Sequence, residues 1–69
     1  MIGHYTAKEN IVSALLIMGV PEKEAGDKAI HYLERVGLSA QRDQRASKLS
    51  SGQKQRLSIA RALAKDTDI

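Results

Sequence analysis

The sequence predicts an all-α fold, a small bundle of three main helices joined by a short connector. The 69 residues contain only two aromatic side chains, Tyr5 and Tyr32, so the core is built from Leu, Ile, Val, Ala and Met, which favours helix-on-helix packing over a sheet. Apolar residues recur at helical spacing. Two capping boxes, which are helix-start patterns of the form S/T-x-x-E/Q, begin at Thr6 and Ser50.

The first helix is predicted from Ala7 to about Met18, after the capping box of Thr6 and Glu9. Residues 11–18 are apolar on nearly every side, which indicates that a further surface packs on this helix. The simpler alternative is that the small fold itself buries the helix. Gly19 supplies the left-handed residue that ends it.

The second helix is predicted from Pro21 to about Val36, because proline suits a first helical turn, where its missing N–H costs nothing. Gly37 closes the helix, and Gly26 in its interior costs about 1 kcal/mol relative to alanine. The expected core stripe has helical spacing and consists of Ala25, Ala29, Leu33 and Val36.

Residues 38–48 are polar without sustained periodicity and are interpreted as a connector, in which Ser39 can cap a short turn through Gln44. The last helix is expected to begin at Ser50, which forms the second capping box with Gln53. The side chains expected to be buried on this helix are Leu57, Ala60, Leu63 and Ala64.

Length and composition limit the chain to one small domain or a piece of one. A core of this size is marginal, and neither disulfides nor a metal site reinforce it, since cysteine is absent and His4 and His31 have no neighbouring ligand residues. We assign no role to these histidines. No apolar run approaches the roughly 20 residues that span a bilayer, and no signal peptide opens the sequence, so a soluble, cytosolic protein is expected.

The formal net charge of +3 is unevenly distributed. Between Arg42 and Lys65, seven basic residues face a single acidic one, Asp43. A solvated helix face is the ordinary interpretation, and attraction of an anion is the alternative. The basic residues are Arg42, Arg45, Lys48, Lys54, Arg56, Arg61 and Lys65.

Residues 50–53 form the candidate anion-binding site of this sequence. A helix start exposes free backbone N–H groups and the positive end of the helix dipole, which together bind anions. Ser50 and Ser51 add hydroxyl donors, and Gly52 lets the backbone approach a phosphate closely. An ordinary helix cap is the alternative that the capping box alone favours.

This segment resembles the signature sequence of ABC ATPases. Leu49-Ser50-Ser51-Gly52-Gln53 is similar to L-S-G-G-Q, and residues 54–63 resemble the helix that follows it in the family. Residues 6–11 resemble the family's T-x-x-E-N-(V/I) helix start, and residues 36–38 its V-G-L turn. The likeness therefore covers nearly the whole chain in the family's order.

The resemblance implies that residues 1–69 form a single helical signature subdomain, a fragment of a larger nucleotide-binding domain. In this family two such domains close head to tail around two ATP molecules. By carry-over, Ser50 and the backbone of Ser51 and Gly52 contact the γ-phosphate of ATP held by the opposing domain, while Gln53 lies near the nucleotide or orients the loop. The implied partners are a second nucleotide-binding domain and transmembrane transporter subunits, which places the parent complex at the inner face of the cell membrane.

The groups needed for hydrolysis are not in this sequence. It has no G-x-x-x-x-G-K-(S/T) phosphate loop, and it stops at Ile69, where the family enters the strand whose acidic residues handle magnesium and water. The expectation is a segment that is no enzyme alone and binds ATP weakly, within a parent ATPase that uses ATP and Mg²⁺. Ser51 replaces the family's first glycine, which costs about 1 to 2 kcal/mol if the residue needs positive φ.

Two alternatives stay open at this stage. A small basic helical module that binds nucleic acid fits the charge of the last helix, although no aromatic platform or clear recognition helix supports it. A purely structural helical fragment that associates with itself is the other. The sequence leaves open the transported substrate and the direction of transport.

Overall fold

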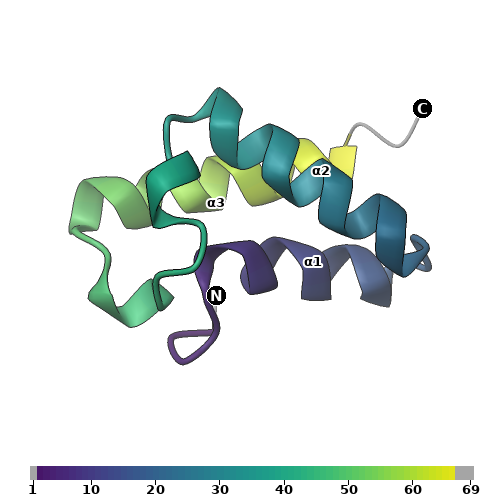
Figure 1. Cartoon of the computed structure of the whole chain (residues 1–69), viewed down its shortest axis with the longest axis horizontal. Coiled ribbons are helices and arrows are strands. Elements are labelled where there is room, and N and C mark those ends of the chain that lie inside the picture. Colours follow the sequence, from purple (N-terminus) through teal and green to yellow (C-terminus); the bar gives the residue numbers. More distant parts are fainter. Residues whose placement is uncertain (1, 67–69) are drawn as a thin grey trace.

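The computed structural model describes residues 2–66 and confirms the all-α prediction. Helices α1 and α2 form an antiparallel hairpin, and α3 packs against both of them (Figure 1). Two single 3₁₀ turns lie in the connector, and the described residues contain no strand beyond one isolated bridge between Thr6 and Arg45. The elements are α1 (Ala7–Ile17), α2 (Glu22–Arg35), η1 (Ser39–Gln41), η2 (Ala46–Lys48) and α3 (Ser51–Asp66).

The helix ends follow local sequence signals closely. Thr6 Oγ1 accepts a hydrogen bond from the Glu9 amide at 3.0 Å, and the Thr6 amide donates to Glu9 Oε1 at 2.8 Å, so the predicted capping box is present. Gly19 (φ 92°) and Gly37 (φ 76°) adopt the left-handed conformation just beyond α1 and α2. Pro21 precedes α2 as its N-cap residue rather than lying in its first turn.

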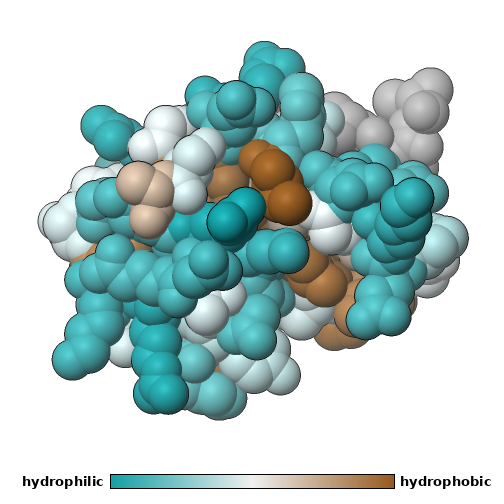
Figure 2. Space-filling model, in the orientation of Figure 1, coloured by the Kyte–Doolittle hydropathy of each residue, from teal (hydrophilic) through white to brown (hydrophobic). Residues whose placement is uncertain are grey.

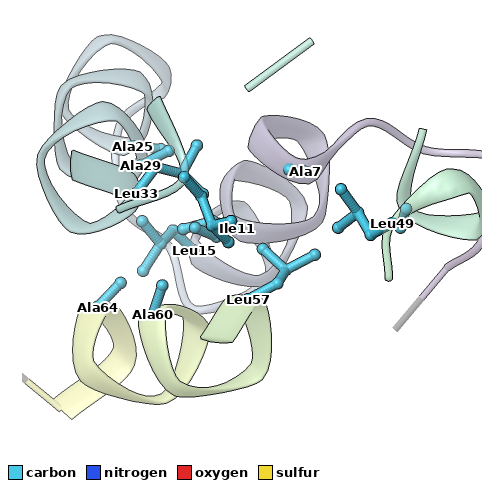
Figure 3. Close-up of a cluster of buried hydrophobic side chains, with 12 residues drawn as sticks. Ala7, Ile11, Leu15, Ala25, Ala29, Leu33, Leu49, Leu57, Ala60 and Ala64 are labelled. Carbon is cyan, nitrogen blue, oxygen red and sulfur yellow. The ribbon is translucent and has the colours of Figure 1, made fainter. Parts of the chain in front are cut away.

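The core lies where the three α-helices meet. Figure 3 shows Ile11 and Leu15 of α1 pointing between the two other helices. Leu57 of α3 completes the centre. Alanines from the flanking helices let the backbones approach closely. The other buried apolar residues are Ala7, Ala25, Ala29, Leu33, Leu38, Ala46, Leu49, Ala60 and Ala64.

One predicted core residue lies elsewhere. Leu63 is 37% exposed, whereas its neighbour Ala64 is buried. Adjacent residues are about 100° apart around a helix axis, so a narrow contact stripe that includes Ala60 and Ala64 leaves Leu63 at its edge. The core stripe predicted for the second helix agrees better with the structure, since Ala25, Ala29 and Leu33 are buried and Val36 packs against the core while remaining partly exposed.

The connector contributes to the core, which its polar sequence did not reveal. Leu38 and Ala46 are buried, as is Leu49 directly after the connector, and each lies in or beside a short 3₁₀ turn rather than in a long helix. Isolated apolar residues of this kind have no periodicity from which their burial could be predicted.

The last turn of α1 and the residue after it expose apolar side chains. Ile17 is 87% exposed, and Leu16 and Met18 are also exposed, so the alternative in which this fold buries the whole helix is wrong at this end. Figure 2 shows apolar patches on an otherwise mostly hydrophilic face. The described residues therefore do not supply the covering surface that the sequence suggests for α1.

Two glycines should respond in opposite ways to replacement by alanine. Gly37→Ala should lower the free energy of unfolding by about 1 to 2 kcal/mol, because the residue has φ 76°. Gly26→Ala should raise it by about 0.5 to 1 kcal/mol, because Gly26 lies inside α2 and an added Cβ meets no atom within 4 Å. Urea unfolding followed by circular dichroism measures both, and equal effects of the same sign would contradict this account.

Candidate functional site

The start of α3 is held by the predicted capping box. The Gln53 amide donates to Ser50 Oγ at 3.1 Å, and the Ser50 amide donates to Gln53 Oε1 at 3.0 Å. The Lys54 amide donates to the Ser50 carbonyl at 2.8 Å. These bonds fix the turn and use the acceptor side of both capping side chains.

Two backbone donors remain free at this turn. Within residues 2–66 the amides of Ser51 and Gly52 make no hydrogen bond, and both residues are exposed. Ser50 is exposed as well, and its hydroxyl proton is available because the hydroxyl oxygen serves only as an acceptor in the capping box. Three donors from consecutive residues are thus available to a ligand.

The start of α1 is closed by comparison. Its first two amides, those of Ala7 and Lys8, donate to the carbonyls of Gln44 and Arg42, each at 3.0 Å. The third donates to the side chain of Thr6. The connector therefore saturates this helix end, although α1 and α3 begin at the same end of the molecule (Figure 1).

The start of α2 is acidic. Glu22 and Glu24 lie in its first turn, and their charges disfavour an anion there. The first turn of α3 contains no acidic residue and is followed by Lys54. Among the three α-helix starts in the described part of the chain, α3 combines free amides with the electrostatics that suit an anion.

Ser51 carries no backbone strain. Among the described residues only Gly19 and Gly37 have positive φ, and Ser51 is the first residue of α3. The energetic penalty considered for serine at this position is therefore absent, and the amide that the family's glycine would supply is present.

Gly52 leaves open space at the free helix end. A Cβ built on it meets no atom within 4 Å, so no neighbour in the described chain requires glycine there. The same is true of Gly26 in α2, so this property alone indicates nothing. At the start of α3, however, the missing side chain keeps two unpaired amides accessible.

The seven basic residues are spread over the connector and α3. Most are exposed, which agrees with a solvated surface, and Arg42 pairs with Asp43 at 3.6 Å across an exposed contact worth little energetically. Arg61 and Lys65 line an open hollow farther along α3 with Ser58 and Ala62.

The histidines make edge contacts with their neighbours, His4 with Tyr5 and His31 with Tyr32. No group of three or more His, Cys, Asp or Glu side chains within residues 2–66 is arranged to hold a metal ion.

Comparison with known proteins identifies the family. All 69 residues match the family model described as ABC transporter, and the chain belongs to this family. The nucleic-acid-binding alternative gains no support from these matches.

Similar curated proteins are ATP-binding components of bacterial transport systems. A methionine import ATP-binding protein of Paraburkholderia xenovorans is 53% identical over 93% of this chain and 17% of its own length. An arginine/ornithine transport ATP-binding protein of Pseudomonas aeruginosa is 42% identical over 96% of this chain and 26% of its own. A lipoprotein-releasing system ATP-binding protein of Rhodopseudomonas palustris is 41% identical over 100% of this chain and 31% of its own length.

The chain thus spans between about a sixth and a third of the length of these relatives and corresponds to part of an ABC ATP-binding protein. No helix within residues 2–66 is long and apolar enough to cross a bilayer.

Replacing Ser50 and replacing Gly52 by alanine should change the free energy of unfolding differently. Ser50→Ala should lower the free energy of unfolding by about 1 kcal/mol, because the Gln53 amide loses its acceptor. Gly52→Ala should leave that free energy unchanged or raise it by up to about 1 kcal/mol, because its Cβ enters open space in a helix. Denaturant unfolding measures both, and a destabilised Gly52→Ala variant would show that the glycine has a folding role.

Proposed function

We propose that this segment is the helical signature subdomain of an ABC transport ATPase and that its α3 start binds ATP held by an opposing nucleotide-binding domain. One observation carries the proposal: the amides of Ser51 and Gly52 are exposed and unpaired at a helix start without acidic residues. Membership of the ABC transporter family supports a phosphate as the anion.

In this proposal the γ-phosphate receives hydrogen bonds from the Ser51 and Gly52 amides and from the Ser50 hydroxyl. The positive end of the α3 dipole adds attraction for its negative charge. Gln53 orients the turn, since its carboxamide oxygen already accepts a hydrogen bond from the Ser50 amide. Because these donors are held in place before the ligand arrives, little reorganisation accompanies binding.

The proposed contribution is to binding and to the closure of two domains. Phosphate loop, magnesium ligands and water-positioning residue belong to other parts of the parent protein, since residues 1–69 contain no Walker-type phosphate loop. ATP, with Mg²⁺, supplies the reacting phosphoryl group, and this segment alone holds it weakly. Closure around ATP then requires the turn at residues 50–53 of one subunit and the phosphate loop of the other.

We further propose that the exposed apolar end of α1 faces the transmembrane subunits of the transporter. Leu16, Ile17 and Met18 lie together at this end and are exposed in the described chain. The relatives are named as ATP-binding proteins of import, transport and lipoprotein-releasing systems. In this proposal the parent protein lies at the inner face of the membrane, where closure of the domains drives transport.

A negative charge at the free helix end should abolish ATP turnover by the intact protein. In that protein, Gly52→Glu should lower turnover at saturating ATP at least about a hundredfold, because a carboxylate occupies the space of the phosphate and repels it. Nucleotide binding to the separate subunits should persist, because the phosphate loop that holds ATP is elsewhere. Steady-state phosphate release and equilibrium binding of a fluorescent ATP analogue give the two readouts.

Ser58→Glu is the matched control, since it adds the same charge at an exposed position farther along α3. Its turnover should stay within about threefold of that of the unaltered protein. Full turnover by Gly52→Glu, or an equal loss in both variants, would refute the proposed contact.

The isolated chain of 69 residues should show no ATP hydrolysis. Its exposed apolar side chains on α1 and α3 favour self-association, so size should be measured at several concentrations alongside activity. Hydrolysis that copurifies with the chain and survives removal of contaminating ATPases would overturn the assignment of the catalytic groups to the rest of the parent.

A further inference from the structure

A buried amide side chain ties the residues before α1 to that helix. Asn10 is only 2% exposed and is the buried polar residue among residues 2–66. Its Oδ1 accepts a hydrogen bond from the Ile2 amide at 2.7 Å, and its Nδ2 donates to the carbonyls of Ile2 and Thr6, each at 3.0 Å. Both backbone groups of Ile2 are therefore held by one side chain.

The segment held in this way, residues 2–6, is itself bonded to the connector. The Ser47 amide donates to the Gly3 carbonyl at 3.0 Å, and the Ala46 amide donates to the Tyr5 carbonyl at 2.8 Å. Figure 1 shows the N-terminal segment beside the connector at the end of the molecule where α3 begins. Ala46 and Leu49 are buried, and Ser50 follows directly.

We propose that Asn10 is a positioning residue for the phosphate-binding turn, an inference that rests on the function proposed above. Asn10 sits beside Ile11 in a helix whose core side chains are fully buried, so it is a rigid anchor. Asn10 fixes Ile2, and backbone hydrogen bonds link residues 2–6 to residues 46–47 of the connector. Because Ser50 follows shortly after, these bonds also fix the position of the turn at residues 50–53.

The choice of side chain supports this assignment. A buried amide is costly unless its polar atoms are paired, and a leucine of similar size would pack there without that cost. Here the amide gains its partners by holding a segment that has no helix of its own. Asparagine at position 10 therefore does more than fill space in the core: its hydrogen bonds hold residues 2–6 in place before α1.

The first experiment measures hydrogen exchange by mass spectrometry in the intact protein that carries this segment. Asn10→Leu should speed exchange of the amides at residues 44–49 about tenfold and leave those of α2 unchanged, because only the tie to residues 2–6 is lost. Ile11→Val is the control, since it weakens the core of the same helix without touching that tie. It should speed exchange in α2 and the connector alike.

The second experiment replaces the lost tie by a covalent one. A Cβ built on Gly3 lies 3.6 Å from Cβ of Ser47, a separation that suits a disulfide. Residues 1–69 contain no cysteine, and any cysteine elsewhere in the intact protein would be replaced by serine. In the Asn10→Leu background, oxidised Gly3→Cys/Ser47→Cys should restore turnover that Asn10→Leu lowers about tenfold, and reduction should remove the rescue.

The outcomes separate this inference from the proposed function. Uniformly faster exchange in Asn10→Leu, or failure of the oxidised crosslink to restore turnover, would overturn the positioning role even if Gly52→Glu abolishes turnover. If Asn10→Leu speeds exchange only at residues 44–49 but turnover survives Gly52→Glu, then Asn10 does hold the connector in place and the proposed phosphate contact is wrong. If Asn10→Leu does not fold, Asn10→Ser takes its place in both experiments, and unchanged exchange at residues 44–49 together with full turnover would overturn the proposal.

Discussion

The pairing of backbone amides at helix starts is the constraint on which this structure depends. Each α-helix begins with N–H groups that have no partner inside the helix. These groups pair with side chains, with carbonyls elsewhere in the chain, with water or with a ligand. The connector donates two carbonyls to α1, which closes that helix start, whereas the α3 start keeps two free amides. Acidic side chains occupy the α2 start. Within residues 2–66 the three α-helix starts thus differ, and that of α3 combines free amides with charges that suit an anion.

A small, alanine-lined core makes the rest of the arrangement dependent on backbone bonds. Ile11 and Leu15 supply the bulk, and short side chains on α2 and α3 bring the helices close. The connector has only two buried apolar residues, Leu38 and Ala46, so its hydrogen bonds to residues 3, 5, 7 and 8 do much to fix its position. The turn at residues 50–53 directly follows the connector, and in the role proposed for Asn10 its position depends on these bonds and on those between Asn10 and Ile2.

Most helix limits were predictable, because they are set by residues within a turn of one another. Thr6 with Glu9 and Ser50 with Gln53 form their capping boxes as expected, and Gly19 and Gly37 end their helices. The errors arose where packing decides. Leu63 lies at the edge of the narrow contact stripe. Leu38, Ala46 and Leu49 are buried without periodicity, and the buried Asn10 side chain pairs with the backbone of Ile2, eight residues upstream. Asn10 follows Lys8 and Glu9 and precedes the mostly apolar run of residues 11–18, so no pattern in the sequence marks its burial.

By itself the sequence determined the three helices, their caps and the turn of small residues from Ser50 to Gln53, since hydrogen bonds within four residues specify these features. Tertiary structure alone decided which helix start stays open. The acceptors for the Ala7 and Lys8 amides are carbonyls of Gln44 and Arg42, far along the chain, and no local pattern announces such pairs. The sequence points to exposed amides at residues 50–53, and the fold adds that the first amides of α1 are paired with the connector while those of Ser51 and Gly52 are free.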